Sequence, residues 1–355
     1  MGSIPTLPGI TSQLIETPRL LTHVLFSGPA SGIPVVFLHG NASSSTYWEA
    51  TMLALPAQYR AIAPDLRGYG DSEDKLIDAT RGYGDWVDDV RGLADVLGLT
   101  RFHLVGHSMG GTLVLNLVAA APARVVSATV AAPGSPYGFG GTKGLDGTPC
   151  YADFAGSGGG VVNPEFARLI SIGERGADNP QAAPRVVMNS FYWKPPFRAA
   201  REEELLSSLL SEKIGPDKYP GDFVASPNWP GIAPGVYGPA NAMAPKYVGE
   251  SVRCLIAADP KPPILWVRGA DDQIVSDSSF FEFGTLGKFG IVPGWPGDAI
   301  YPAQPMVGQT RAVLEQYQAN GGWFAEHVLP DTGHTPYIER PAEFNALLAE
   351  QLGRA

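Results

Sequence analysis

A serine flanked by glycines, Ser108 in "LVGHSMGG" (104–111), is the first candidate for chemistry in this chain. The pattern Gly-x-Ser-x-Gly is weak alone, because short motifs match glycine-rich chains by chance. Its context is more specific, since an apolar strand-like run (102–107) ends directly before the serine and an apolar helix-like run (109–121) follows it. A sharp strand–turn–helix junction is the nucleophile elbow, in which strained backbone lifts the hydroxyl outward. We therefore predict that Ser108 is a nucleophile.

A serine hydroxyl needs a base and an acid that orients the base. The chain has six histidines: His23, His39, His103, His107, His327 and His334. His103 and His327 fall inside strand-like runs, and we interpret them as packing or surface residues. His107 adjoins Ser108, so its side chain is expected to point away from it. His334 lies in a polar loop between the last strand and the last helix, which opens at the carboxyl edge of a parallel sheet, where Ser108 also lies. His334 is the predicted base.

The acid comes from the segment "RGADDQIV" (268–275), which ends a strand and offers Asp271 and Asp272. Spacing alone does not choose between the two carboxylates. Either one gives the chain order Ser, Asp, His that is typical of a strand–turn–helix elbow on a parallel sheet.

The elements that must position these residues alternate between strand-like and helix-like patterns. Short apolar runs predict buried parallel strands at 35–40, 60–65, 102–107, 125–133, 263–272 and 324–334. Helical spacing of apolar residues predicts helices at 84–98, 109–121, 306–320 and 341–352. Such alternation predicts an α/β fold with a mostly parallel sheet covered by helices on both faces.

The alternation breaks between residues 134 and 262, a stretch rich in Gly, Pro and aromatic residues. We predict a core made of 1–133 and 263–355, with 134–262 as a cap or lid insertion containing one helix at 197–214. A second insertion falls at 276–305. Aromatic residues of the cap could line a pocket or form the cap's own core, and these readings stay open for Tyr137, Phe139, Phe191, Tyr192, Trp193, Phe197 and Trp229. Lys194 and Arg198 could bind an anionic group, but a solvated face is the simpler interpretation.

Taken together, the motifs resemble those of α/β-hydrolase fold enzymes of the serine hydrolase or esterase type. The resemblance covers 1–133 and 263–355 and rests on "HGNA" (39–42), "PDLRGYGDS" (64–72), "GHSMGG" (106–111), "GADDQIV" (269–275) and "GHTPYIERP" (333–341). It implies that Asp272 rather than Asp271 orients His334, because the family pattern G-x-x-D-x-x-V runs from Gly269 to Val275. It also implies an oxyanion hole made by the backbone N–H groups of Asn41 and Met109.

The region from "FLHGN" (37–41) to "APDLRGYG" (63–70) also resembles haloalkane dehalogenases and epoxide hydrolases, but those enzymes use an aspartate nucleophile. A serine attacking an alkyl halide or epoxide would form an ether that is not readily released, so Ser108 favours acyl transfer. We expect hydrolysis of a carboxylic ester or lactone through an acyl-enzyme. Two alternatives stay open: hydrolysis of a carbon–carbon or amide bond by the same three residues, and a receptor or binding protein on the hydrolase fold.

Composition limits the partners of the chain. A net charge of −10 over 355 residues argues against nucleic acid and anionic membrane surfaces as partners. If the aromatic-rich insertion caps the site, it implies a small, apolar molecule as substrate. The N-terminal stretch lacks a basic and an apolar segment of the secretory kind, which favours a cytoplasmic location. Two cysteines imply no disulfide framework, and free thiols are favoured although one bridge stays open. Motifs for a metal or an organic cofactor are missing, so we expect neither. Oligomeric state is left open.

Overall fold

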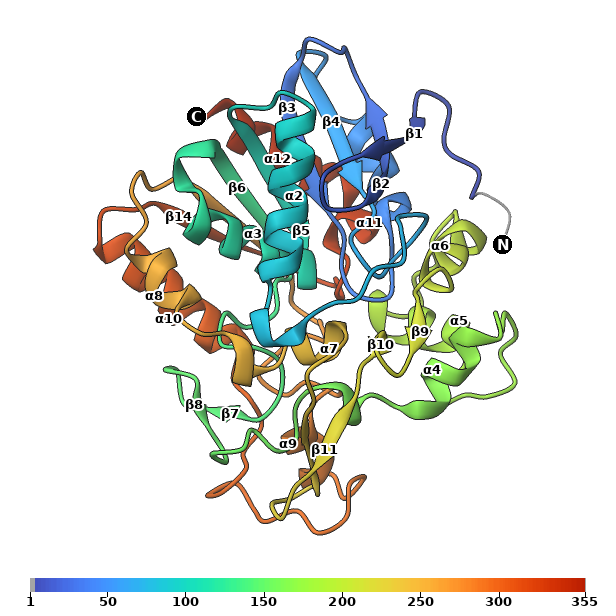
Figure 1. The fold of residues 1–355 in the computed structure, drawn as a ribbon, viewed down its shortest axis with the longest axis vertical. Helices are drawn as coiled ribbons and strands as arrows, with labels where there is room; N and C mark the ends of the chain where they lie inside the picture. Colours follow the sequence, from blue (N-terminus) through green and yellow to red (C-terminus); the bar gives the residue numbers. More distant parts are fainter. Residues whose placement is uncertain (1–3, 355) are drawn as a thin grey trace.

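An eight-stranded sheet organises the chain, and the computed structural model describes residues 4–354 (Figure 1). The strands are β1 (Thr11–Glu16), β2 (Leu21–Ser27), β3 (Ile33–Leu38), β4 (Tyr59–Pro64), β5 (Phe102–His107), β6 (Val125–Ala131), β13 (Ile264–Gly269) and β14 (Phe324–Leu329). They lie in the order β1-β2-β4-β3-β5-β6-β13-β14. β2 pairs antiparallel with β1 and β4, and all the other neighbours are parallel. The predicted α/β fold with a mostly parallel sheet is confirmed.

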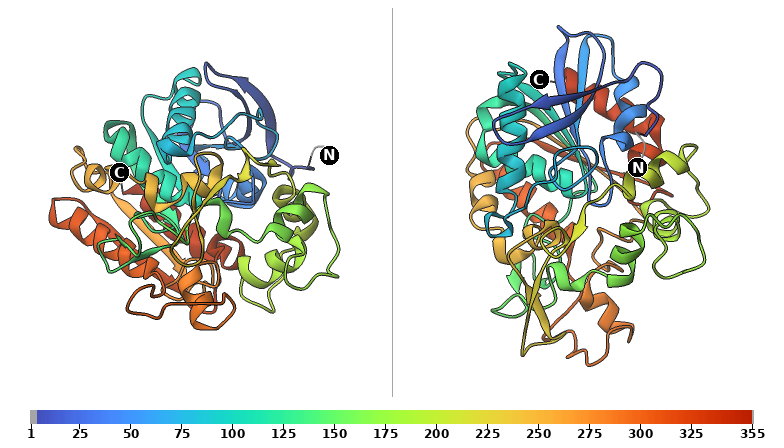
Figure 2. Two further views of the ribbon diagram at one scale, coloured as in Figure 1. Left: turned by 60° about the horizontal axis from the view of Figure 1, so that its bottom comes forward. Right: turned by 45° about the vertical axis from the view of Figure 1, so that its right-hand side comes forward.

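Helices cover both faces of this sheet (Figure 2). The first face carries α2 (Gly84–Val96), α3 (Met109–Ala120), α8 (Ser251–Ile256) and α10 (Met306–Ala319). The second carries α1 (Glu49–Leu53), α11 (Pro336–Glu339) and α12 (Pro341–Gly353). Consecutive strand residues alternate between the two clusters: Val36 and Trp266 pack on the first face, and Val35 and Leu265 on the second. The period of two follows from the pleat of a strand and explains why these runs are apolar throughout.

The predicted core helices are confirmed to within about two residues at each end, the usual uncertainty of helix boundaries. α2 is amphipathic and places Trp86, Val90 and Leu93 in the core. α3 is apolar nearly all round because it lies between the sheet and its neighbours α2 and α8. The helix that follows Ser108 is therefore held rigidly from several sides.

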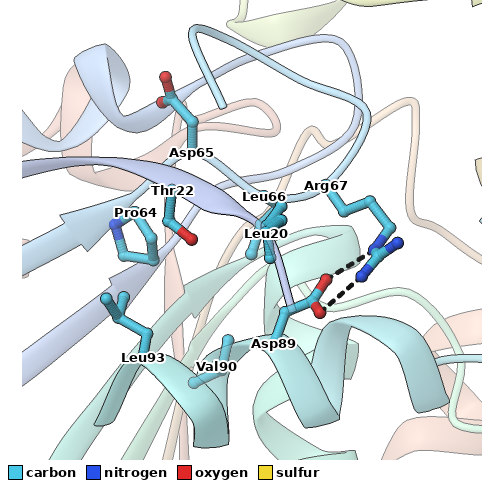
Figure 3. A pocket seen from close by; sticks show the side chains of 9 residues that line it. All are labelled: Leu20, Thr22, Pro64, Asp65, Leu66, Arg67, Asp89, Val90 and Leu93. Atoms are coloured by element: carbon cyan, nitrogen blue, oxygen red, sulfur yellow. Dashed lines mark hydrogen bonds and ion pairs between the residues drawn. The ribbon is translucent and has the colours of Figure 1, made fainter. Parts of the chain in front are cut away.

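A buried ion pair fixes the loop after β4 to α2. Arg67 donates from Nε and Nη2 to the two carboxylate oxygens of Asp89, at 2.7 and 2.8 Å (Figure 3). Such a two-point contact sets direction as well as distance. Trp86 adds a hydrogen bond from its indole N–H to the Arg67 carbonyl, at 3.0 Å. The loop after β4, which also contains Tyr69, is thus anchored to α2.

The segment 134–262 contains more helices than the one predicted. α4 (Pro164–Ser171), α5 (Pro184–Val187), a π-helix (Met188–Tyr192) and α7 (Pro239–Ala242) were all missed. α4 begins with a local signal, since Asn163 Oδ1 accepts the Glu165 N–H at 3.0 Å and Pro164 takes the first helical position.

The predicted helix at 197–214 is wrong in extent, because the structure has only α6 (Glu202–Leu209). Phe197 donates its N–H to the Lys194 carbonyl in a turn, and Arg201 has non-helical backbone angles. The acidic run Glu202–Glu204 suits a helix start, where the positive end of the helix dipole lies.

The two insertions pack against one another. Gln304 of the second accepts the Gly140 N–H of the first at 2.7 Å, and Tyr301 donates to the Gly156 carbonyl at 3.1 Å. α8 behaves differently, because it packs against the core helix α3 although it falls within 134–262. The division of the chain at 134 and 262 stays a prediction.

Cys150 is half-buried and Cys254 exposed, and both are free thiols. The prediction of free thiols is therefore confirmed. Across residues 4–354, no helix has both the length and the apolar character needed to cross a membrane.

Candidate active site

Ser108 stands on a strained turn between β5 and α3, with φ of 54° and ψ of −120°. L-residues rarely adopt such angles, and the strain marks a position whose geometry is imposed by its surroundings. The flanking glycines are required by close backbone packing. A Cβ on Gly106 would lie 2.2 Å from the carbonyl oxygen of Gly110, and one on Gly110 would lie 2.3 Å from that of Leu38. The Gly-x-Ser-x-Gly pattern is therefore a packing requirement of the elbow.

Asp272 and His334 are in direct contact below this elbow. The Nδ1–H of His334 donates to Oδ2 of Asp272 at 2.8 Å, and both side chains are buried. The other oxygen, Oδ1, accepts the N–H groups of Ile274 and Val275 at 2.8 and 2.9 Å. Both carboxylate oxygens are thus fixed, and Nε2 of His334 is left as the unprotonated nitrogen.

Asp271, the alternative acid, points elsewhere. It is exposed, and its carboxylate accepts a hydrogen bond from Nζ of Lys194 at 3.0 Å. Lys194 also pairs with Asp331, so its charge is used at the surface rather than in the cavity. The structure brings Asp272, and not Asp271, to His334.

The loop that carries His334 is held by two further side chains. The carboxylate of Glu339 accepts the N–H groups of Gly333 and Lys194, both at 2.8 Å. The carbonyl of His334 accepts Nε2–H of His107 at 2.8 Å. Burial, together with the nearby side chain of His334, lowers the pKa of His107 well below its usual value. His107 is therefore a neutral donor, and it supports the loop without competing for the proton at Ser108.

Two segments with free backbone N–H groups adjoin the serine within residues 4–354. Met109 is the first residue of α3, where N–H groups have no partner within the helix. Asn41 follows Gly40, and a Cβ on Gly40 would lie 3.1 Å from the Cβ of Ser108, so this loop runs directly against the serine. Within residues 4–354, the N–H groups of Asn41 and Met109 have no acceptor within hydrogen-bond distance. The assignment of these two groups to an oxyanion hole stays a prediction.

Two tyrosines hold the Asn41–Ala42 loop. Tyr69 donates to the side-chain oxygen of Asn41 at 2.7 Å, and Tyr192 donates to the carbonyl of Ala42 at 3.1 Å. Ala42 has φ of 46°, a left-handed conformation that costs free energy in a residue other than glycine. The hydrogen bond from Tyr192, a residue of the first insertion, offsets part of that cost. The insertion thus contacts the loop directly.

Three other histidines are either hydrogen-bonded elsewhere or exposed. His39 accepts the Leu66 N–H at Nε2, at 2.9 Å, and burial lowers its pKa. His103 is hydrogen-bonded to Ser127, and burial lowers its pKa to about 4, while His327 is exposed. In the described part of the chain, no three His, Cys, Asp or Glu side chains gather in a way that would hold a metal ion.

Ser108 and His334 both line one cavity of about 660 Å³. The core contributes the polar end, and the two insertions contribute most of the apolar wall. Of the cap aromatics, Phe139, Phe191 and Tyr192 line this cavity, whereas Tyr137, Trp193, Phe197 and Trp229 do not. The second insertion adds Phe280, Phe281, Leu286 and Ile291, which the sequence alone did not single out. Among the described residues that line the cavity there is no Asp, Glu, Lys or Arg.

Comparisons with known proteins identify the family of the chain. Residues 35–347 match the profile of the alpha/beta hydrolase family. The chain is 34% identical over 120 residues to the uncharacterized carboxylesterase nap of Bacillus subtilis, a match that covers 33% of this chain and 38% of that protein. It is 33% identical over 172 residues to a 2-hydroxymuconate semialdehyde hydrolase of a Pseudomonas species, which covers 48% of this chain and 55% of that protein. The chain thus spans less than two thirds of the length of each.

A solved structure extends the likeness over the whole fold. The carboxylesterase CesB of Bacillus subtilis superposes with a TM-score of 0.60 at 17% identity, covering 98% of this chain and 92% of that one. At this identity the likeness concerns the fold, with its sheet and its helices, rather than the reaction.

Proposed function

Because the chain belongs to the alpha/beta hydrolase family, we propose that it is a serine hydrolase that cleaves uncharged carboxylic esters or lactones. Ser108 is the nucleophile, His334 the general base and Asp272 the group that orients it. The backbone N–H groups of Asn41 and Met109 form the oxyanion hole. These assignments are supported by the strained elbow, by the contact between Asp272 and His334, and by the two N–H groups beside the serine.

The reaction proceeds in two acyl-transfer steps. Oγ of Ser108 attacks the carbonyl carbon while Nε2 of His334 takes the hydroxyl proton, and the carbonyl oxygen becomes negative between the two N–H groups. The carbon–oxygen bond to the alcohol then breaks, and His334 returns the proton to the leaving oxygen. Water, deprotonated by His334, releases the acid from Ser108. Asp272 stays ionised throughout and stabilises the charged imidazole.

The observation that carries the substrate class is the cavity itself. Its described lining contains no ionised carboxylate, ammonium or guanidinium group, and it consists mainly of aliphatic and aromatic side chains. An acyl or alcohol group with its own charge would be buried without a partner, which costs several kcal/mol. A neutral, apolar ester fits without that cost, and a volume of about 660 Å³ accommodates a medium-chain acyl group.

The same observation disfavours carbon–carbon bond hydrolysis. One relative is named for 2-hydroxymuconate semialdehyde, whose name denotes a carboxylic acid. A substrate of that kind would place a carboxylate in a cavity whose described lining offers no cation. Esters also need less activation than amides, because an alkoxide or aryl oxide leaves more readily than an amine.

A matched set of substrates tests the proposal. We compare kcat/KM for p-nitrophenyl octanoate, the mono-p-nitrophenyl ester of suberic acid and octanoyl p-nitroanilide. The neutral ester is expected to be the best, with the equally long charged ester slower by roughly a hundredfold or more. Equal rates for the neutral and charged esters would contradict the substrate class. Preferred turnover of the anilide would contradict ester specificity, and turnover that survives in Ser108→Ala would contradict the mechanism.

A further inference from the structure

A second serine, histidine and aspartate lie in line at the end of the sheet formed by β1, β2 and β4. Ser12 in β1 places its Oγ 2.7 Å from Nε2 of His23 in β2, and Nδ1 of His23 lies 2.7 Å from Oδ2 of Asp65, which follows β4. The register explains the first contact. His23 pairs with Leu14, so Ser12, two residues earlier in β1, is its diagonal neighbour on the same face of the ribbon.

Asp65 is an anchored, ionised carboxylate. Burial on its own would raise its pKa, but the hydrogen bond and charge of His23 outweigh burial and bring the pKa to about 2. Oδ1 accepts the N–H and the hydroxyl of Ser45 at 2.8 and 2.6 Å, and Oδ2 also accepts the Asp71 N–H at 2.8 Å. In Figure 3 its carboxylate points away from the ion pair of Arg67 and Asp89, so this guanidinium does not neutralise it.

These contacts fix the protons of the group. Burial alone would lower the pKa of His23, but the hydrogen bond and the charge of Asp65 raise it above its usual value, so His23 is neutral only above that raised pKa. An ionised carboxylate only accepts hydrogen bonds, so the proton of neutral His23 is on Nδ1 and the lone pair of Nε2 faces Ser12. The hydroxyl of Ser12 then donates to Nε2. This is the order of contacts by which an aspartate and a histidine activate a serine. The histidine–aspartate distance, 2.7 Å, is close to the 2.8 Å found between His334 and Asp272.

The surroundings differ from those of Ser108. Ser12 is exposed on the edge strand of the sheet, and His23 is mostly covered, with 13% of its side chain exposed. None of the three residues lines the cavity. An acyl donor can therefore reach Ser12 from solvent without passing the insertions.

We propose that Ser12, His23 and Asp65 form a second nucleophilic site, on the surface, that accepts acyl groups from activated esters. Nε2 of His23 takes the proton of Ser12 as Oγ bonds to the carbonyl carbon. The bond from that carbon to the aryl oxygen breaks, and the aryl oxide leaves with the proton from His23. The products are an ester of Ser12 and a phenol. Ser12 lies inside a strand and not at a helix start, so no helix N–H groups stabilise the negative oxygen that forms on the carbonyl. Aryl esters are therefore the substrate class that fits, because their good leaving groups make the reaction least dependent on such stabilisation.

The test removes the cavity site first. Ser108→Ala protein is incubated with p-nitrophenyl acetate at a pH above the raised pKa of His23, where Nε2 is unprotonated, and acetylation of each serine is followed by peptide mass spectrometry. Exposed Ser278 of the second insertion serves as the reference within the same molecule. General-base assistance predicts acetylation of Ser12 about a hundredfold faster than that of Ser278.

Two further variants isolate the cause. Adding His23→Gln should reduce the acetylation rate of Ser12 to that of Ser278, and circular dichroism verifies the fold. Ser12→Ala in the otherwise native chain leaves Asp65 and His23 in place and should leave turnover by Ser108 unchanged. Equal acetylation of Ser12 and Ser278, or fast acetylation of Ser12 that persists in folded His23→Gln protein, would overturn the proposal.

Discussion

Replacing Asp272 by asparagine is the sharpest perturbation of the proposed mechanism. Oδ1 of Asp272 accepts two backbone N–H groups, from Ile274 and Val275. An asparagine must keep its one carbonyl oxygen at that position, because its NH2 group there would face two donors. The NH2 group consequently replaces Oδ2 and donates to Nδ1 of His334. The proton of the imidazole then moves to Nε2, and this nitrogen can no longer accept the proton of Ser108.

The magnitude follows from the loss of the base. Forcing the wrong tautomer of a catalytic histidine while keeping its geometry lowers kcat by about 10⁴-fold, which corresponds to about 5 kcal/mol. The assay is p-nitrophenyl octanoate turnover, measured for all variants at the same mildly alkaline pH. Thermal unfolding should change little, because the asparagine keeps its backbone contacts.

Asp271→Asn is the matched control. It removes the same charge one residue away, from an exposed carboxylate paired with Lys194, and should leave kcat within about threefold of the native value. Activity of Asp272→Asn within tenfold of native would refute the role of Asp272 in selecting the tautomer. An equal loss in both variants would indicate a general effect of charge.

Three other perturbations test the structure around the site. Gly106→Ala places a Cβ 2.2 Å from the Gly110 carbonyl oxygen, so the free energy of unfolding should fall by about 1–3 kcal/mol in a urea titration, and an unchanged value would contradict the packing account. Tyr192→Phe leaves the Ala42 carbonyl without its hydrogen bond and should lower kcat about tenfold while the melting temperature stays near native; unaltered kcat would show that the loop is held without it. The pKa of Asp65 is about 2 in the folded chain, below the ordinary value of 3.8, so its stabilising contribution is complete above that value and disappears as the pH falls. The stability difference between native and Asp65→Asn protein should accordingly shrink by about 2 kcal/mol from pH 6 to pH 2, and a constant difference would exclude this linkage.

The core of the fold could be predicted from local sequence patterns. The buried strands, the helix after Ser108 and the two glycines of the elbow are each specified by neighbouring residues, through apolar runs and through a backbone that tolerates no Cβ. Spacing could not separate Asp271 from Asp272, because both end the same strand. The difference arises from the turn, where Oδ1 of Asp272 accepts two N–H groups that follow it.

Contacts between distant segments could not be predicted from the sequence. His107 is 227 residues from His334, and Tyr192 is 150 residues from Ala42, yet each pair is hydrogen-bonded. No local sequence pattern predicts hydrogen bonds between residues so far apart in the chain. For the same reason, only part of the cavity wall was predicted. Phe280 and Phe281 were not, because they come from a second insertion whose position over the site depends on its packing against the first.

Treatment with a fluorophosphonate, followed by peptide mass spectrometry and ester turnover on the same samples, tests the central claim most directly. The account predicts that loss of turnover parallels modification of Ser108, one for one. Complete loss of turnover with Ser108 unmodified, or full turnover with Ser108 fully modified, would contradict it.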